Sequence, residues 1–239
     1  MGRFLTAVQF LTLVPSGGDG PPARGAIFFP IVGAAIGLAA GGIRIGAAKL
    51  FPAPIAALLT LGFLIIITGG LHEDGLADVF DAFRAGRSPE KIQAILKDSR
   101  IGVYGAVALL MTVLLRWQAI VFLDRGAVSA LVAAVGASRG AMVGFAYISR
   151  PLGDGLGKAF CRGLNRPDVV VTAIQSAALP FLCGPVAGVL AICANVLAVA
   201  GARAYFHRRA GGVTGDCMGA LCQISEISTL LIVVCLQFT

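Results

Sequence analysis

Charged residues are scarce in this chain of 239 residues. They make up 13% of the composition, whereas 57% of the residues are hydrophobic and the mean hydropathy is +0.89. Soluble domains usually carry about 25% charged residues, so a chain this apolar would aggregate in water. No polar stretch is long enough to form a separate soluble domain. We therefore predict an all-α polytopic membrane bundle in which residues 1–239 form a single transmembrane domain.

The sequence also lacks paired cysteines. None of the six cysteines forms a C-x-x-C pair, and most lie in apolar runs, where a free cysteine behaves as a small hydrophobic residue. This pattern argues against a disulfide framework and against a zinc site. Basic and aromatic residues are not interleaved in one patch, so the net charge of +7 does not indicate nucleic-acid binding.

Seven apolar segments are candidates to cross a bilayer, which takes about 20 residues per helix. They are residues 27–48, 53–70, 105–123, 127–148, 169–183, 186–204 and 218–238. The fifth is short and contains Pro180, so it is the weakest of the seven. The first contains Gly33, Gly37 and Gly41 at four-residue spacing, which favours close helix packing. Residues 1–14 are too short to span, and we expect an interfacial helix ending at Pro15 (residues 1–15) rather than a signal peptide.

The basic residues predict the orientation. Most of them fall in three polar stretches, 72–104, 149–168 and 205–216, which share one side if all seven spans are real. The opposite connections hold little beyond Lys49 and Arg125. The positive-inside rule then places these stretches and the N-terminus in the cytoplasm and the C-terminus outside. We therefore expect a multi-pass protein of the cytoplasmic (inner) membrane, with 72–104 as a cytoplasmic loop region rich in acidic and basic residues.

Acidic residues are the scarcest charged type, and they cluster in residues 72–81. Asp74, Asp78 and Asp81 are spaced i, i+4 and i+7, so on a helix they share one face. Carboxylates this close repel one another unless a cation neutralises them, and together with Glu73 they suit Mg²⁺, which prefers oxygen ligands. The alternative is a solvated acidic face. His72 beside them is a candidate ligand or base, or simply a polar residue at the interface.

A second cluster combines Lys97, Asp98, Ser99 and Arg100 with nearby glycines. Lysine, arginine and serine beside glycines suit phosphate oxygens, because glycine lets the backbone approach a ligand closely. A charged loop at the membrane surface is the equally open alternative. We treat Lys97, Ser99 and Arg100 as candidate substrate-binding residues. Asp98 is a candidate catalytic residue, as is His72.

A third cluster lies at the start of the last span. Asp216 begins it, Gln223 lies seven residues later on the same face, and Glu226 lies inside the span. Asp216 is a candidate catalytic residue or a helix N-cap. Polar and ionisable residues inside a span are functional by default, so Glu226, Gln223 and Arg139 are candidate substrate-binding residues. Pairing of Arg139 with an acid is the structural alternative for that residue.

Two further arginines, Arg44 and Arg116, lie nearer to the ends of their predicted spans. We expect their side chains to extend to the interface and to have no chemical role.

Several stretches together resemble one family, cobalamin (5′-phosphate) synthase, also called adenosylcobinamide-GDP ribazoletransferase. They cover nearly the whole chain, and their order is more specific than any one of them. The matching stretches are residues 10–12 with Pro15, 28–33, 70–78, 97–105, and 214–226 with Asp216, Gly219, Ala220, Gln223 and Glu226.

The resemblance implies a Mg²⁺-dependent enzyme late in cobalamin biosynthesis. It would join adenosylcobinamide-GDP to α-ribazole or its 5′-phosphate and release GMP. The resemblance also implies kinship of mechanism with CDP-alcohol phosphotransferases, whose metal motif is D-x-x-D-G-x-x-A-R. This sequence departs from that motif, because Ala77 is followed by the acid Asp78, whereas the alanine of the motif is followed by arginine.

The residues and the resemblance together give a hypothesis for the mechanism. Asp74, Asp78 and Asp81 would hold one or two Mg²⁺ ions on the pyrophosphate, and Asp216 would complete the metal site or take the proton of the attacking hydroxyl. Arg100 and Arg139 would steady the phosphates.

Two rival readings remain open at this point. One is a phospholipid-forming CDP-alcohol phosphotransferase. The other is a secondary transporter, which the clustered acids and the lack of a convincing internal repeat disfavour. The sequence does not decide between a monomer and a homo-oligomer, and it does not show whether partner enzymes dock on the protein.

Overall fold

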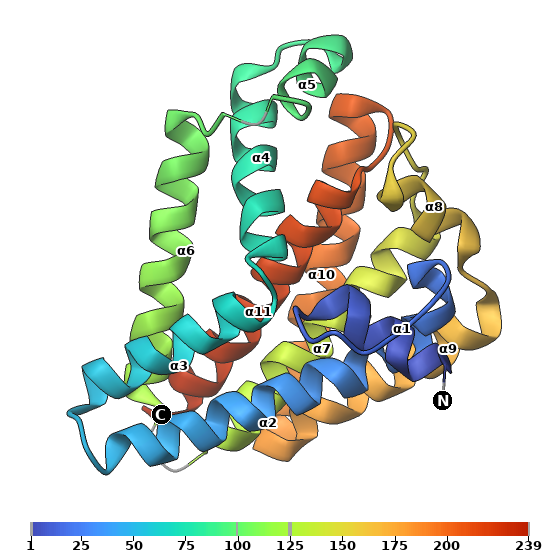
Figure 1. Ribbon diagram of the computed structural model, residues 1–239. Coiled ribbons are helices and arrows are strands. Elements are labelled where there is room, and N and C mark those ends of the chain that lie inside the picture. The colour runs from blue at the N-terminus through green and yellow to red at the C-terminus, as the bar shows by residue number, and fades with distance from the viewer. Residues whose placement is uncertain (1, 99, 124–125, 239) are drawn as a thin grey trace.

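The computed structural model describes residues 2–98, 100–123 and 126–238, and helices form its whole framework (Figure 1). The longer helices are α2 (Phe29–Ala48), α3 (Ala53–Ile67), α4 (Leu71–Ala85), α6 (Val103–Phe122), α7 (Ala127–Ile148), α10 (Pro185–Ala210) and α11 (Gly215–Gln237). The shorter ones are α1 (Gly2–Leu11), η1 (Pro22–Phe28), α5 (Pro89–Ile95), α8 (Leu156–Gly163), α9 (Arg166–Ala178) and η2 (Leu179–Cys183). The prediction of an all-α chain is therefore confirmed.

Among the described residues, five helices are long and apolar enough to cross a membrane, and a bent pair of helices would make a sixth span. The five are Pro22–Ala48, Val103–Phe122, Ala127–Ile148, Pro185–Ala210 and Gly215–Gln237. A polytopic membrane protein is confirmed, but the expected number of seven spans is too high. The predicted span 169–183 is instead a 13-residue helix, α9, followed by the 3-10 turn η2 that contains Pro180.

The predicted span 53–70 ends early because the chain bends between α3 and α4. These two helices meet at 86° and are the bent pair that would make the sixth span. Gly69 and Gly70 adopt φ values of +64° and +68°, a left-handed conformation that favours glycine. Their N–H groups bond back to the carbonyls of Ile66 and Ile65, both at 3.0 Å, and so close the end of α3. The acidic residues then lie on the helix α4 rather than in a loop.

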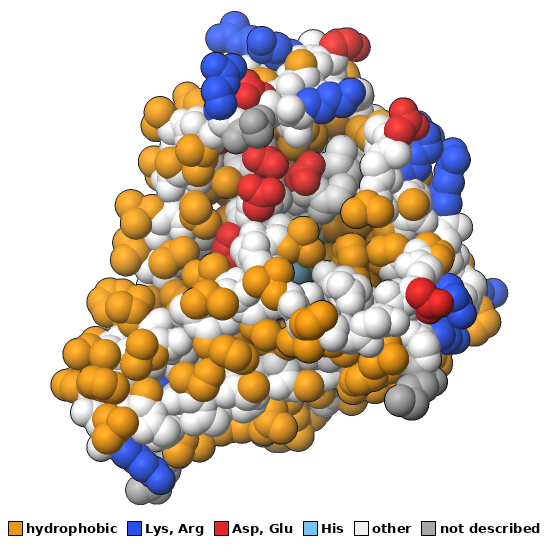
Figure 2. Space-filling model, viewed as in Figure 1, with side chains coloured by type: hydrophobic (Ala, Val, Ile, Leu, Met, Phe, Trp, Pro, Cys, Tyr) orange, Lys and Arg blue, Asp and Glu red, His pale blue; other side chains and the backbone are white. Residues whose placement is uncertain are grey.

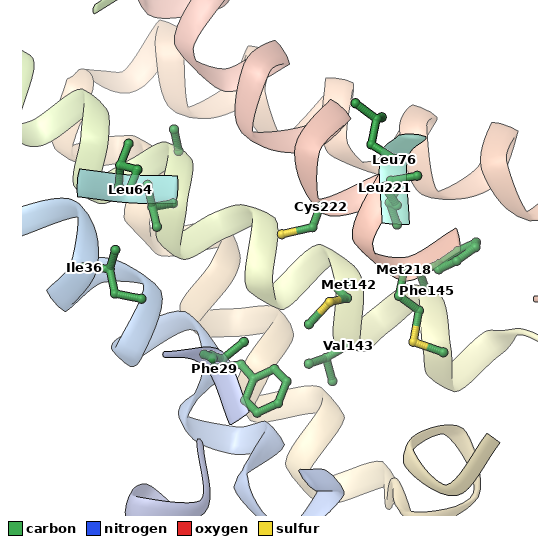
Figure 3. Close-up of a cluster of buried hydrophobic side chains, with 14 of the residues drawn as sticks. Phe29, Ile36, Leu64, Leu76, Met142, Val143, Phe145, Met218, Leu221 and Cys222 are labelled. Carbon is green, nitrogen blue, oxygen red and sulfur yellow. The ribbon is translucent and has the colours of Figure 1, made fainter. Parts of the chain in front are cut away.

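The glycine stripe of α2 packs against α7, as its spacing predicted. A Cβ atom built on Gly33 would lie 2.6 Å from the carbonyl oxygen of Val135, and one on Gly41 would lie 2.9 Å from the Cα of Val128. Only glycine allows the two backbones to come this close. Figure 3 shows the apolar side chains of α2, α7 and α11 that fill the adjoining core, among them Phe29.

Large apolar side chains also cover the outside of the bundle. Examples that are more than half exposed are Leu38, Leu58, Ile66, Leu110 and Leu197. A soluble protein rarely exposes so many large apolar side chains, whereas lipid tails would surround them without cost.

The three polar stretches of the sequence meet at one end of the molecule. The guanidinium of Arg209, at the end of α10, donates hydrogen bonds to the carbonyls of Phe83 and Gly86 at 3.0 and 2.9 Å. An isolated β-bridge joins Pro151 to Val213. After α8, the chain leaves this end because α9 and η2 pack back along α7, and α10 then returns to it, with Arg203 bonded to the carbonyl of Ile148 at the end of α7. The side of the membrane on which this end lies stays a prediction.

Candidate active site

The acids of α4 and the start of α11 come together because two glycines let these helices pack closely. A Cβ atom on Gly75 would lie 3.0 Å from the Cα of Asp216, and one on Gly219 would lie 3.4 Å from the Cα of His72. The carboxylate of Asp78 is consequently within electrostatic range of Asp74, Asp216 and Asp81. Figure 2 shows acidic side chains gathered over α4 in a hollow, with basic side chains above and to the right of them.

A cavity of about 440 Å³ opens beside these acids, between α4, α5, α8 and the start of α11. We call it the α8-side cavity. Two acids, Asp74 and Asp216, and two lysines, Lys97 and Lys158, are among the residues that line it. The cavity therefore offers negative and positive groups to the same ligand, which suits a phosphate ester with a bound cation.

A second cavity of about 580 Å³, the α1-side cavity, lies between α1, the α3–α4 bend and α6. It shares Phe10, Leu71 and Asp74 with the α8-side cavity. Asp74 is thus accessible from two directions, so two reactants could meet at its carboxylate.

Asp81 faces α6 and caps the start of that helix. Its carboxylate accepts hydrogen bonds from the backbone N–H groups of Gly102 and Gly105, at 2.7 and 2.9 Å. Neither glycine could carry a side chain there, because a Cβ atom on either would collide with this carboxylate. A negative charge at a helix N-terminus is stabilised by the unpaired N–H groups and the helix dipole. Asp81 therefore has a structural partner that the sequence did not indicate.

The metal site predicted from sequence is only partly assembled. The structure brings Asp74 and Asp78 together with Asp216, but Asp81 binds backbone N–H groups and Glu73 faces an arginine. Among the described residues, no three histidine, cysteine, aspartate or glutamate side chains are placed to hold a metal ion as they stand. The chemistry of the donors nevertheless fits Mg²⁺. Within the described part of the chain, Asp74, Asp78 and Asp216 form no ion pair, and clustered carboxylate oxygens are its usual ligands.

A buried network of ion pairs lies beneath the acids. Arg116 of α6 donates to Glu73 at 2.6 Å, to Gln223 at 3.0 Å and to Glu226 at 2.7 Å. Arg139 of α7 donates to the other oxygen of Glu226. The two arginines and two glutamates balance in charge, which is what allows them to be buried among apolar helices.

Three candidate substrate-binding residues, Arg139, Gln223 and Glu226, are thus occupied by one another or by Arg116 in this structure. The expectation for Arg116 was wrong, because only 2% of this residue is exposed and its guanidinium lies inside the bundle. Arg44 is also mostly buried, and its Nε lies 3.5 Å from the carbonyl oxygen of Ile120.

His72 is buried at the wall of the α8-side cavity. It is 1% exposed, and neither ring nitrogen has a hydrogen-bond partner among the described residues. An imidazole with two unpaired nitrogens is costly to bury. A ligand in the cavity could remove this cost by bonding to the ring.

The cluster after α5 is more exposed than the acids. Arg100 donates to both carboxylate oxygens of Asp98, at 3.0 and 2.7 Å. The guanidinium and the backbone N–H of Arg100 lower the pKa of Asp98 to about 2, and the carboxylate in turn raises the pKa of Arg100. Lys97 lines the α8-side cavity, and Ser99 lies outside the described residues.

Two features of the candidate site were not predicted from the sequence. One is Arg116, which looked like a residue near the end of a span. The other is the loop 153–158, where Gly153, Gly155 and Gly157 alternate with Asp154 and Leu156 before Lys158, and which lines the α8-side cavity. The alternation of glycines followed by lysine was the available signal, since such loops often approach phosphates.

Comparison with known proteins identifies the family of the chain. The family described as cobalamin-5-phosphate synthase matches residues 3–234. Curated relatives include an adenosylcobinamide-GDP ribazoletransferase of Geotalea daltonii, 34% identical over 97% of this chain and 96% of the relative. Others with the same description are from Mesorhizobium japonicum, 38% identical over 85% of this chain and 80% of the relative, and from Clostridium tetani, 30% identical over 99% and 97%.

No solved structure matches the chain. The family match spans nearly the whole sequence, from α1 into α11, and therefore includes both clusters of acids and the buried arginines. The chain belongs to the cobalamin-5-phosphate synthase family.

Proposed function

We propose that the chain joins adenosylcobinamide-GDP to α-ribazole or its 5′-phosphate and releases GMP, with the acids of α4 and α11 at the reaction centre. The enzyme is an adenosylcobinamide-GDP ribazoletransferase, a transferase of cobalamin biosynthesis, as its family and full-length relatives indicate. The observation that carries the site assignment is Asp74, which lines two cavities and lies beside Asp78 and Asp216.

The reaction is a displacement at phosphorus. A hydroxyl of the ribazole attacks the phosphorus next to the cobinamide, a new P–O bond forms, and the P–O bond to GMP breaks. Such transfer depends mainly on positioning and on neutralising phosphate charge. Mg²⁺ bound by Asp74 and Asp78 would supply that neutralisation. Asp216 is the candidate to accept the hydroxyl proton, because it borders the cavity and, among the described residues, its carboxylate accepts a side-chain hydrogen bond from Thr214 of its own helix start alone.

Basic residues around the α8-side cavity support the binding of the donor. Lys97 lines the cavity, and Arg100 follows it closely in the chain. Lysine and arginine bind phosphate oxygens through charge-assisted hydrogen bonds. Arg100 would have to exchange its bond to Asp98 for one to a phosphate, since the structure pairs the two side chains.

The polar end of the molecule faces the cytoplasm of a cytoplasmic membrane in this proposal. The basic side chains concentrate there, in the stretches that meet around Arg209, and positive loops stay on the cytoplasmic side. The nucleotide donor and the ribazole would then reach the site from the cytoplasm.

The test is a reconstitution with purified protein, adenosylcobinamide-GDP, α-ribazole 5′-phosphate and Mg²⁺, followed by detection of GMP and the joined product. We expect the product to form, and to disappear when EDTA removes the metal. An inactive, folded wild-type protein would reject the function, and full activity in EDTA would reject the metal.

The role of the acids is tested by Asp78→Asn, which keeps the shape of the side chain and removes its charge. We expect the rate to fall by at least about a hundredfold, the cost of losing one group that stabilises charge in the transition state. Glu90→Gln is the matched control, because Glu90 is an exposed acid of α5 that lines neither cavity. Equal rates for the two variants would show that Asp78 is not part of the active site.

A further inference from the structure

The loop before α8 runs along the wall of the α8-side cavity. Residues Gly153 to Lys158 all line this cavity, and Gly153 has a φ of +70° that favours glycine. The N-cap of α8 is Gly155, which makes no side-chain capping bond because it has no side chain. The first N–H groups of α8 are therefore left without a side-chain cap beside the cavity.

A second helix start adjoins the first one. A Cβ atom on Gly157 would lie 2.5 Å from the backbone nitrogen of Gly215, so the first turn of α8 touches the first turn of α11. Thr214, the N-cap of α11, also makes no side-chain capping bond, and both Thr214 and Gly215 line the cavity. Two helix ends thus border one space. The start of α8 has no acidic residue in its first turn and favours an anion, whereas the start of α11 already carries the carboxylate of Asp216.

The cavity is lined by charges of both signs. Lys97 and Lys158 lie near Asp154 of the loop, whereas Asp74 lies on α4 and Asp216 in the first turn of α11. Lys158 is held at 2.6 Å by Asp154, whose own side chain is 94% exposed. The pairing lowers the pKa of Asp154, so this carboxyl group is charged at neutral pH. A diphosphate could lie between the lysines on one side and a cation on the acids on the other.

His72 gives an independent indication that a ligand belongs in this cavity. It is buried, it lines the cavity, and both of its ring nitrogens lack a partner among the described residues. A buried polar group without a partner usually awaits water or a ligand. The cavity volume of about 440 Å³ is within the range of pockets that bind small molecules.

We propose that the loop 153–158, together with the start of α8, binds the diphosphate of the nucleotide-linked donor. The inference rests on the proposed function, and it adds a binding element that the acids do not provide. The loop N–H groups and Lys158 hold the phosphate oxygens, and the carboxylates of Asp74 and Asp216 hold the cation that accompanies them. The α1-side cavity is then left for the hydroxyl acceptor.

The experiment measures KM for each substrate with the full-length enzyme in lipid nanodiscs. We expect Lys158→Gln to raise KM for adenosylcobinamide-GDP about tenfold, the typical cost of one hydrogen bond to a charged group, and to leave KM for α-ribazole 5′-phosphate unchanged. Arg162→Gln removes the same charge one turn further along α8, from an exposed residue that does not line the cavity, and should change neither value.

A second pair of variants keeps the fold and changes only the charge at the loop. No atom lies within 4 Å of a Cβ built on Gly155, and aspartate and asparagine are about equally good N-caps. We expect Gly155→Asp to raise KM for the donor at least about tenfold more than Gly155→Asn, because its carboxylate would repel the diphosphate. Equal donor KM values for these two variants, with Lys158→Gln like the wild type, would overturn the proposal.

Direct binding separates this inference from the reaction itself. We expect GDP to bind the wild-type protein in calorimetry more tightly than guanosine does, and Lys158→Gln to weaken only GDP. Affinities for GDP that are equal in the wild type and Lys158→Gln would refute the loop assignment even in an active enzyme. An inactive enzyme whose GDP binding still depends on Lys158 would refute the proposed function and leave the loop as a phosphate site.

Discussion

Glu226 connects two arginines that come from different helices, and its charge decides whether either can stay buried. Arg116 reaches it from α6 and Arg139 from α7, and none of the three residues is more than 2% exposed. The structural alternative that the sequence left open for Arg139, a pairing with an acid, is the arrangement present here. A residue of this kind can be essential for activity without touching the substrate, because it fixes the helices that carry the acids.

We predict that Glu226→Gln destabilises the protein by about 3–5 kcal/mol, since it leaves an uncompensated positive charge in the bundle. Thermal unfolding in detergent measures this loss. Arg139→Met alone should also destabilise, but the double variant should lose less than the sum of the two, because it restores a neutral pair of Arg116 and Glu73. Strictly additive losses would show that the buried charges do not interact.

Asp81 allows a contrasting prediction at the same scale. Because it caps the start of α6, Asp81→Ala should lower stability by about 0.5–2 kcal/mol, the usual cost of losing an N-cap. The Mg²⁺ concentration that gives half-maximal activity should stay close to that of the wild type, whereas Asp78→Asn should raise it. A large rise in the Mg²⁺ requirement of Asp81→Ala, measured by titration, would show that Asp81 is a ligand of the metal.

The helices α2 and α7 pack closely because the contact positions on α2 are glycines, and substitutions in α2 test this. Gly37→Val would drive a side chain into the backbone of Leu131, whose carbonyl carbon lies 2.7 Å from the position of an added Cβ. We expect this variant to lose about 1–3 kcal/mol or more of stability, as over-packed cores do. Gly46→Val on the same helix meets no atom within 4 Å and should unfold at nearly the wild-type temperature. Equal unfolding temperatures for the two variants would contradict the packing.

Hydropathy predicted the membrane-spanning helices well, because their assignment does not depend on which other helices they pack against. The spans α2, α6, α7, α10 and α11 need only length and apolar composition, and both are read directly from the sequence. The bend before α4 depends on two adjacent glycines at the end of an apolar run, and glycine is too common in this chain to mark a bend by itself.

The candidate site was also predicted only in part, because the contacts between distant residues are not visible in the sequence. The spacing of Asp74 and Asp78 predicted that both lie on one helix face. Their approach to Asp216 depends on Gly75, and the sequence does not show that Gly75 packs against Asp216. Arg116 pairs with Glu226, which lies 110 residues away in the chain. No local pattern in the sequence therefore distinguishes it from an arginine that reaches the interface.

For the whole molecule, the meeting of the polar stretches at one end predicts a single topology. Arg209 bonds to the end of α4, and Pro151 pairs with Val213, so residues near 87, 154 and 208 belong on the same side of the membrane. Lys49 lies at the other end of α2, a span of 27 residues counted with η1. Reporter proteins fused after residues 87 and 208 should therefore be active only as cytoplasmic reporters, and a fusion after residue 50 only as an external one. Fusions at 87 and 208 that report opposite sides would break the arrangement in which the donor, the acids and the loop 153–158 share one compartment.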